Sequence, residues 1–485
     1  MFKACFKGLI TTGKLSGRLL VFLLFGLKQI FKLIFRKKNT SFGSASFANP
    51  KRIQKAESFK EKGFILGKIK GQFLRFKKPG HLICFAPTRT GKGTGLVIPN
   101  ALDHPGSLVV TDIKGENLAV AGRQRTKFGE VFALAPFAAY SSCYNPLDFI
   151  RVGQEEEGDD AAKIVEMLVV GTPGVDPFWD KEAKSLLKGL ILYVVHHKPD
   201  NLKNLGEMRH ILMSGPDDFE QYLRLMEESK NPLIHQVANS MFQKEPKLRS
   251  SVISTAQSHT HIWDSKKLLN ITSHSDFQIE DLKENPMSLF LVIPPENLET
   301  HQPFLRLMVG LSLAAMTRNE KRPKDNVLFL LDEFPALGRL QPVENAIAYQ
   351  ATYGVSLWLL VQDLNQLKTV YGQSYKTFIS NCNVRQAFGV SDYDTAKILS
   401  DMLGRETISI KSHSSSGAFD DLVAPDRLNQ TTSHTGRALL TPDEIMRLPS
   451  NEQLIFLQGE RPIKAEKIEY FREGTFQGMF DEWAA

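Results

Sequence analysis

The sequence APTRTGKGTG (86–95) holds the Gly-Lys pair of a phosphate-binding loop. It departs at two positions from the common pattern G-x-x-x-x-G-K-[ST]. Ala86 stands in place of the first glycine, and Gly93 stands in place of the serine or threonine. The stretch is therefore a working nucleotide site, a decayed one or a chance Gly-Lys pair, and its context has to decide.

The residues that flank this loop favour a parallel α/β sheet. HLICFAP (81–87) is a short apolar run that leads into the loop, and TGLVIPNALDH (94–104) can begin the helix that must follow it. Pro99 limits that helix to one regular turn or requires a kink. A second apolar run, in SLVVTDIKGEN (107–117), ends in Asp112. Because such sheets bind ligands at the carboxyl ends of their strands, we expect the site at that edge.

A later strand supplies the acidic half of such a site. In NVLFLLDEFPALGRL (326–340), five apolar residues run directly into Asp332 and Glu333. The first carboxylate of such a pair holds Mg²⁺, directly or through water, and the second can polarise the attacking water. Two solvated acids at the end of a strand are the alternative interpretation, but a Gly-Lys loop followed by an apolar-acidic strand is a less common combination.

Two further apolar runs place polar residues at strand ends. GVSLWLLVQDLNQL (354–367) leaves Gln362 at the end of a strand that lies beside the acidic strand if sequential strands are neighbours. Gln362 can sense the γ-phosphate or orient water, or it simply caps the strand. NCNVRQAFGV (381–390) contains Arg385, which is either a structural arginine or an arginine finger that reaches a neighbouring subunit's phosphate.

Between the two halves of the site, residues 151–285 have a different character. After the acidic stretch QEEEGDD (154–160), helical periodicity dominates and strand signals are few. In the run at 178–197, apolar residues form one stripe: Ala183, Leu186, Leu187, Leu190, Ile191 and Val194. The pattern predicts an all-helical domain inserted into the α/β domain, which resumes with MSLFLVIPP (287–295).

The overall composition is that of a globular protein, with 485 residues, of which 42% are apolar and 23% charged. Its four cysteines form no C-x-x-C pair, and its histidines show no metal-ligand spacing. This pattern suits a reducing cytosol and argues against a disulfide framework and a zinc site.

The charge is unevenly distributed along the chain. Residues 1–80 carry 19 Lys and Arg against two acidic residues, which leaves 41 basic and 51 acidic residues for the remainder. A basic leader on a mildly acidic body predicts an anionic surface beside the N-terminus, either lipid headgroups or nucleic acid.

The N-terminal stretch RLLVFLLFGLKQIFKLIFRKK (18–38) is apolar but interrupted by charges. A membrane span needs about twenty apolar residues, and the unbroken run ends at Leu27. Lys28, Lys32 and Arg36 share one helical face, which favours a cationic amphipathic helix in the membrane interface. A short true span and a helix packed on another protein are the alternatives.

A set of stretches between residues 80 and 475 matches one family in order. They are APTRTGKGTG (86–95), VVTDIKGEN (109–117), YNPLDFI (144–150), PFWDKEAKSLLKGLILYV (177–194), VLFLLDEFPALGRL (327–340), LVQDLNQLKTVYG (360–372), NCNVRQAFG (381–389) and ALLTPDEIMRLP (438–449). Through them the chain resembles the type IV secretion coupling proteins of the TraG family, the cytoplasmic motors of bacterial conjugation.

The resemblance implies a RecA-like P-loop ATPase core with an inserted all-α domain that recognises substrate. It implies a homo-hexamer around a DNA channel and hydrolysis of ATP with Mg²⁺. By position, Lys92 matches the phosphate-binding lysine, Asp332 the metal-associated acid, Glu333 the catalytic carboxylate and Gln362 the sensor. Many relatives also have glycine after the lysine, as at Gly93. Many carry two transmembrane helices, whereas this chain offers one interrupted apolar stretch.

The resulting hypothesis is an ATP-driven coupling protein that pumps relaxase-bound single-stranded DNA to a type IV secretion channel. We expect it at the cytoplasmic face of the bacterial inner membrane, with relaxosome proteins and channel components as partners. A non-hydrolysing relaxosome receptor and an ATPase that exports effector proteins are the alternatives. The expected phosphate cradle consists of Thr88, Arg89, Thr90, Gly91, Lys92, Gly93 and Thr94.

The predicted organisation is a membrane-associated basic segment, a linker, an α/β domain in two parts around the helical insertion, and a tail. Their boundaries are 1–40, 41–62, 63–150 with 286–475, 151–285 and 476–485. The polar run KSHSSSGAFDDLVAPDRLNQTTSHTG (411–436) is expected to be a flexible surface loop, with a subunit contact as the alternative.

Overall fold

The computed structural model describes residues 40–53, 62–171, 176–415 and 428–483. They form two compact units. One consists of the described residues of 46–402 and 440–485, and the other of those of 1–45 and 403–439. The predicted membrane-associated segment, apart from Thr40, lies outside the described residues, as does part of the predicted linker. Among the described residues, no helix is long and apolar enough to cross a bilayer.

The larger unit is built on an 11-stranded sheet with the order β2-β1-β13-β12-β9-β3-β8-β7-β4-β6-β5. The strands from β9 to β5 in this order are parallel, and β2, β1, β13 and β12 extend the sheet with antiparallel pairs. The strands are β1 (Phe64–Ile69), β2 (Gln72–Phe76), β3 (His81–Phe85), β4 (Leu108–Asp112), β5 (Glu130–Leu134), β6 (Met287–Val292), β7 (Val327–Leu331), β8 (Val355–Val361), β9 (Cys382–Ala387), β12 (Glu452–Leu457) and β13 (Ile463–Glu466).

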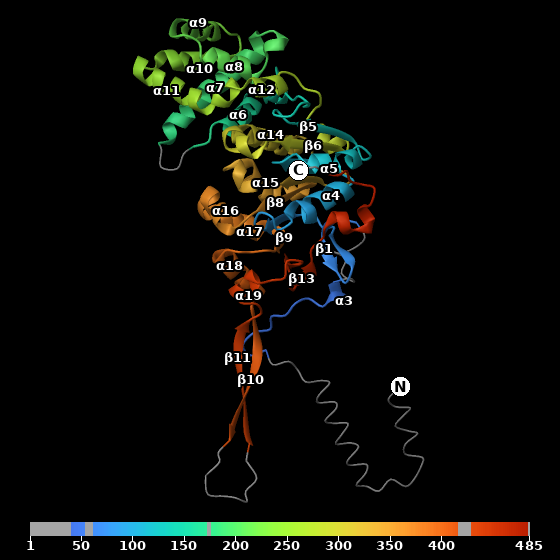
Figure 1. Ribbon diagram of the computed structural model, residues 1–485. Coiled ribbons are helices and arrows are strands. Elements are labelled where there is room, and N and C mark those ends of the chain that lie inside the picture. The colour runs from blue at the N-terminus through green and yellow to red at the C-terminus, as the bar shows by residue number, and fades with distance from the viewer. Residues whose placement is uncertain (1–39, 54–61, 172–175, 416–427, 484–485) are drawn as a thin grey trace, which may run out of the picture. The chain divides into compact units, whose positions relative to one another are not determined.

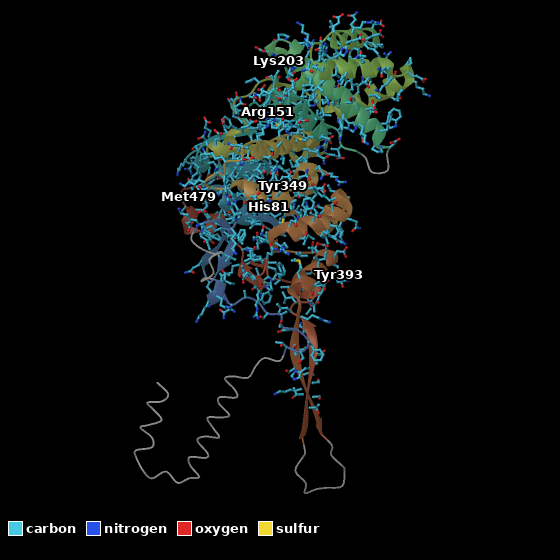
Figure 2. All side chains as sticks on the ribbon, turned by 180° about the vertical axis from the view of Figure 1, so that it is seen from behind. His81, Arg151, Lys203, Tyr349, Tyr393 and Met479 are labelled. Carbon is cyan, nitrogen blue, oxygen red and sulfur yellow. The ribbon has the colours of Figure 1, made fainter. Side chains whose placement is uncertain are left out.

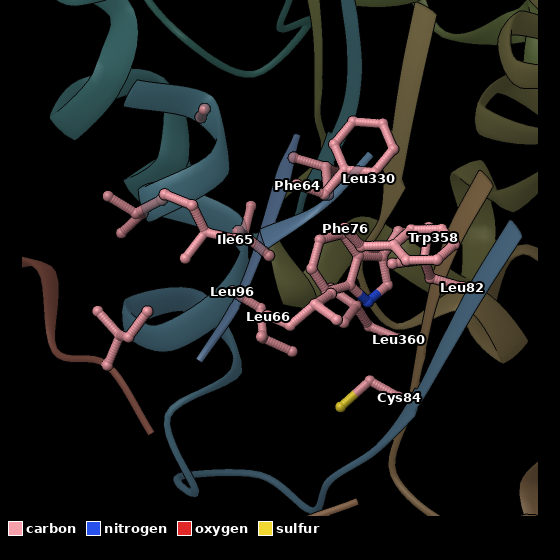
Figure 3. Close-up of a cluster of buried hydrophobic side chains, with 14 of the residues drawn as sticks. Phe64, Ile65, Leu66, Phe76, Leu82, Cys84, Leu96, Leu330, Trp358 and Leu360 are labelled. Atoms are coloured by element: carbon pink, nitrogen blue, oxygen red, sulfur yellow. The ribbon is translucent and has the colours of Figure 1, made fainter. Parts of the chain in front are cut away.

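The central strands are continuous apolar runs because helices or strands cover both of their faces. Every residue of β3, β4, β7 and β8 is buried. On one face, Leu82, Trp358 and Leu360 pack with Phe64 of β1 and with Leu96 of the helix after the loop (Figure 3). This cluster anchors the phosphate loop to the core of the sheet.

The order β3-β8-β7 positions the site. Strand β8 pairs in parallel with β3 on one side and with β7 on the other. The prediction that the strand before Gln362 lies beside the strand before Asp332 is therefore confirmed. Since all three strands end at the same edge, the phosphate loop, Gln362 and the Asp332-Glu333 pair converge there.

Helices connect the strands of the sheet, beginning with the one that follows the phosphate loop. The π-helix η2 (Gly93–Val97) continues as α4 (Ile98–Asp103), which accommodates Pro99 at the change of helix type. The remaining helices of the α/β part are α3 (Pro50–Ile53), α5 (Glu116–Arg125), α14 (Leu298–Arg318), α15 (Gln341–Tyr349), α16 (Leu364–Tyr371), α17 (Tyr375–Asn381), α18 (Tyr393–Leu403) and α19 (Pro442–Met446).

The described part of 151–285 contains helices and no strand. The helices are α6 (Glu157–Leu168), α7 (Pro177–His197), α8 (Leu205–Leu212), α9 (Pro216–Glu227), α10 (Pro232–Gln243), α11 (Pro246–His259), α12 (Lys266–Ile271) and α13 (Asp281–Glu284). The predicted stripe of α7 is buried. Figure 1 shows α7–α12 gathered at one end of the unit, with α6 and α14 between them and the strands. Because this segment and the sheet form one compact unit, the domain boundaries at 151 and 285 stay a prediction.

A buried carboxylate joins the start of the helical segment to α14. Asp160 of α6 has a fully buried side chain, and its oxygens accept from Arg151 (2.8 Å) and Arg318 (2.8 Å). Burial raises the pKa of Asp160, but the hydrogen bonds from Arg151, Lys163 and Arg318 outweigh it and hold the pKa well below its usual range. Figure 2 labels Arg151 between Lys203 of the helical segment and Tyr349 of α15.

The smaller unit contains a hairpin where a flexible loop was expected. Strands β10 (Arg405–Ser415) and β11 (Leu428–Ala438) form a continuous antiparallel ladder from Arg405–Ala438 to Ser415–Leu428. The prediction of a flexible loop is therefore wrong for the described residues of 411–436. Thr431, Thr432 and Thr435 of β11 favour extended backbone because they are β-branched, and this signal was missed because the stretch is rich in serine.

Candidate active site

The phosphate loop leaves β3 through Ala86, whose N–H donates to the carbonyl oxygen of Val361 (2.9 Å). Arg89 and Gly91 have positive φ of 61° and 93°. Ala86 is not among the described non-glycine residues with positive φ, so its methyl group is compatible with the turn, as the sequence argument required. The hydrogen bonds of the described residues include none donated by the N–H groups of Arg89, Gly91 or Lys92.

Three predicted residues meet at the end of these strands. The Nζ atom of Lys92 lies 2.8 Å from Oε1 of Glu333. The other oxygen of the same carboxylate, Oε2, accepts from Nε2 of Gln362 at 2.9 Å. Lys92 is buried, with 7% of its side chain exposed, and Glu333 is 19% exposed. The carboxylate is thus oriented at both oxygens by residues that follow the two other strands of the site, β3 and β8.

Glu333 occupies a strained backbone position. Its φ of 48° and ψ of 45° lie in the left-handed region, which costs a residue with a side chain about 1–2 kcal/mol. This turn reverses the chain directly after β7 and begins the 3₁₀ helix of Phe334–Leu337. Outliers of this kind concentrate at functional sites, where the surrounding structure holds them in place.

Asp332 lies beside this carboxylate without sharing its partners. Its Oδ1 accepts from the N–H of Glu333 (3.0 Å), and its carbonyl oxygen accepts from the hydroxyl of Thr111 on β4 (2.9 Å). Burial raises the pKa of Asp332 to about 6, although Lys92 opposes the shift. A carboxylate that burial disfavours gains from a bound cation, so Asp332 suits the predicted metal role.

A cavity of about 650 Å³ opens beside Glu333 and Gln362. Its wall includes Asp363 and Gln366, from the start of α16, and Pro335 from the turn after the acidic pair. Asp363 caps α16 by accepting from the N–H of Gln366 (2.9 Å). Glu333 is therefore accessible from this cavity.

Arg385 is not brought to this cluster. It lies on β9, in register with Ile83 of β3 and Phe456 of β12. Its Nε has no hydrogen-bond partner among the described residues, and burial lowers its pKa. Its role as an arginine finger for a neighbouring subunit stays a prediction.

With this geometry established, comparison with known proteins places the chain. The family described as type IV secretory system conjugative DNA transfer matches residues 36–484. The chain belongs to this family. It is 31% identical over 449 residues to the conjugal transfer protein TraG of Escherichia coli, covering 84% of this chain and 70% of TraG. It is 28% identical over 436 residues to VirD4 of Rhizobium radiobacter, covering 87% of this chain and 62% of VirD4.

Solved structures of the plasmid coupling protein TrwB share the fold. The complex with the ATP analogue ADPNP has a TM-score of 0.67 at 17% identity, and it covers 92% of this chain and 99% of the TrwB chain. The complex with ADP and Mg²⁺ has a TM-score of 0.67 at 18% identity and covers 91% and 100%. The expected family and the expected RecA-like α/β core are both confirmed.

In this member of the conjugative DNA transfer family, the structure adds two residues that sequence reasoning did not assign to the site. Asp112 ends β4 next to β7; burial raises its pKa to about 6, and its charge contributes to the raised pKa of Asp332. An acid at the end of a buried strand was the available signal. Lys467 lies at the loop itself, donating to the carbonyl oxygen of Thr90, and no sequence pattern marked it.

Proposed function

We propose that this chain is an ATP-driven coupling protein that moves relaxase-bound single-stranded DNA to a type IV secretion channel. The observation that supports it best is the arrangement of Lys92, Glu333 and Gln362 beside Asp332. Membership in the conjugative DNA transfer family supplies the biological context, and the solved complexes of TrwB with ADPNP and with ADP and Mg²⁺ supply the ligand class.

The residues fit a nucleoside triphosphate and a divalent cation. N–H groups of the loop that lack acceptors within the protein, together with the buried ammonium of Lys92, suit a polyphosphate. The carboxylate of Asp332, with help from Asp112, would hold Mg²⁺, which neutralises charge on the phosphate oxygens when bound. Of the predicted cradle, Thr88 and Arg89 are exposed and Thr90 and Gly91 half-buried.

In this proposal, three residues of the chain have separate roles in hydrolysis. Lys92 attracts both Glu333 and the phosphates, so the two anions compete for one ammonium. Glu333, held at its second oxygen by Gln362, acts as the general base toward water in the adjoining cavity. Gln362 senses the γ-phosphate because it is bonded to the residue that works on it.

The finer features of the proposal are a homo-hexamer with ATP between subunits, Arg385 as the arginine finger and DNA gripped through its phosphates. Relaxosome proteins and channel components are the proposed partners. The basic N-terminal segment would associate with the cytoplasmic face of the inner membrane.

Lys92→Ala is expected to abolish ATP hydrolysis in the purified protein, with and without single-stranded DNA, because the buried cation at the phosphates is lost. The measurement is steady-state phosphate release with a DNA titration, and Lys464→Ala, an exposed lysine on β13, is the control. An unchanged rate in Lys92→Ala would refute the assignment. DNA-stimulated hydrolysis in the wild type would also disfavour the effector-export alternative.

Gly93→Ser tests how the site holds its metal. A Cβ at Gly93 meets no atom within 4 Å, so the variant should fold with unchanged or slightly greater stability, by about 0.5 kcal/mol. The added hydroxyl stands where the common pattern binds Mg²⁺, and we expect several-fold tighter Mg²⁺-dependent nucleotide binding by calorimetry. Weaker binding would instead show that the glycine is needed for close approach of phosphate to the backbone.

A further inference from the structure

A second lysine reaches the phosphate loop from the far end of the chain. Lys467 directly follows β13, and its Nζ donates to the carbonyl oxygens of Thr90 (2.5 Å) and Ser450 (2.8 Å). Its own N–H donates to the carbonyl oxygen of Asn451 (2.8 Å). The side chain is therefore held between the turn before β12 and the loop after β3.

The residues around this ammonium bring the loop and the C-terminal strands together. The ring centre of Phe388 lies 4.8 Å from Nζ of Lys467, and the N–H of Phe388 donates to Phe85 at the end of the loop strand. Gly389 has a φ of +61°, and a Cβ there would lie 2.5 Å from Cγ2 of Thr90. Glycine at 389 is thus required for Thr90 to seat against β9.

The chain after Lys467 runs directly against the first turn of the loop helix. A Cβ on Gly95 would lie 2.9 Å from the carbonyl oxygen of Ile468, and a Cβ on Gly91 would lie 3.6 Å from Nζ of Lys467. Glycine at 95 therefore lets the C-terminal segment approach the loop helix, whereas a Cβ at Gly91 would make an ordinary contact with the lysine. Lys467 is therefore half-buried against the loop.

Among the described residues Lys467 has no ion-pair partner, whereas Lys92 is paired with Glu333. Burial lowers the pKa of Lys467, although the charge of Glu469 partly offsets this effect. Burial raises the pKa of Cys84 on β3, and the charges of Lys92 and Lys467 both oppose this rise. The two ammonium groups therefore lie near the same strand end. A partly buried ammonium that is bonded only to carbonyl oxygens is stabilised by an anion.

We propose that Lys467 is a second phosphate-binding cation of this site, which holds the turn at Thr90 and acts on the polyphosphate of a nucleoside di- or triphosphate. The inference rests on the proposed nucleotide function. It makes the last strand of the sheet a contributor to the loop that follows β3.

The test compares three variants by competition against a fluorescent nucleotide, using ATP, ADP and AMP. Lys467→Met should weaken ATP and ADP binding about tenfold, because a hydrogen bond to a charged group is lost, and should weaken AMP binding much less. Lys467→Arg should recover most of the affinity. Lys464→Met, which removes an exposed lysine paired with Glu452 on the neighbouring strand, should change neither affinity nor melting temperature.

Lys467→Gln separates the charge from the hydrogen bonds and replaces Lys467→Met if that variant does not fold. It can still donate to the two carbonyl oxygens, so its melting temperature should stay near that of the wild type while ATP affinity falls. Unchanged ATP affinity in both neutral variants would overturn the inference and leave a purely structural lysine. If Lys92→Ala also binds nucleotide like the wild type, the proposed function itself has failed.

Discussion

Glu333→Gln is expected to lower the rate of ATP hydrolysis by about 10²–10⁴-fold, the usual contribution of a general base. The amide has the same shape, so the turn after β7 and a hydrogen bond with Gln362 can both persist. The ion pair with Lys92 is lost, and the ammonium is then free for phosphate. Nucleotide affinity should therefore remain or increase while turnover falls.

Two measurements distinguish a specific loss of the chemical step from a general loss of the folded nucleotide site. Single-turnover hydrolysis reports the chemical step, and equilibrium binding of a non-hydrolysable analogue reports the site. Glu299→Gln, an exposed carboxylate in the first turn of α14, is the matched control and should leave both unchanged. Wild-type turnover in Glu333→Gln would assign the base to another residue. Continued DNA transfer by this variant in cells would favour the non-hydrolysing receptor.

Asp160→Asn is expected to destabilise the larger unit by about 3–5 kcal/mol, the range for removing one partner from a buried ion pair. The neutral amide leaves the guanidinium groups of Arg151 and Arg318 without their shared carboxylate. Arg318 retains Glu280 (2.6 Å) and Arg151 retains Glu156 (3.6 Å), so the loss is partial for both arginines. Thermal and urea denaturation measure the change, and Asp159→Asn, exposed on the same helix, is the control.

The pH dependence of this stability has a definite sign. The folded-state pKa of Asp160 is depressed, so its contribution is fully present above the unfolded pKa of about 3.9 and is lost as pH falls toward the folded value. The difference between the wild type and Asp160→Asn should be constant from about pH 8 to pH 5 and should narrow below about pH 4. A difference that grows on acidification would contradict the ion-pair explanation.

The parts of the fold that the sequence predicted are those with strong local signals. Continuous apolar runs located β3, β7 and β8, and chain order placed β8 beside β7. Because parallel strands end at one edge, the convergence of Lys92, Glu333 and Gln362 was also predictable. Helical periodicity is also a local signal, and it identified the helical character of 151–285.

The features that escaped prediction depend on contacts between distant residues. Lys467 and Thr90 are 377 positions apart, and only the antiparallel extension of the sheet brings β13 to the loop. The ion pair between Lys92 and Glu333 needs the left-handed backbone at 333, which no residue type specifies there. The hairpin of β10 and β11 was not predicted because composition alone does not make a serine-rich stretch extended. Pairing with the neighbouring strand does.

The adjacency of Gln362 and Asp363 connects the site to the start of helix α16. Gln362 holds the carboxylate of Glu333, and the next residue caps the first turn of α16. The two interactions are therefore made by consecutive residues of one short segment. If Gln362 senses the phosphate as proposed, we expect the state of the nucleotide to change the order of the first turn of α16.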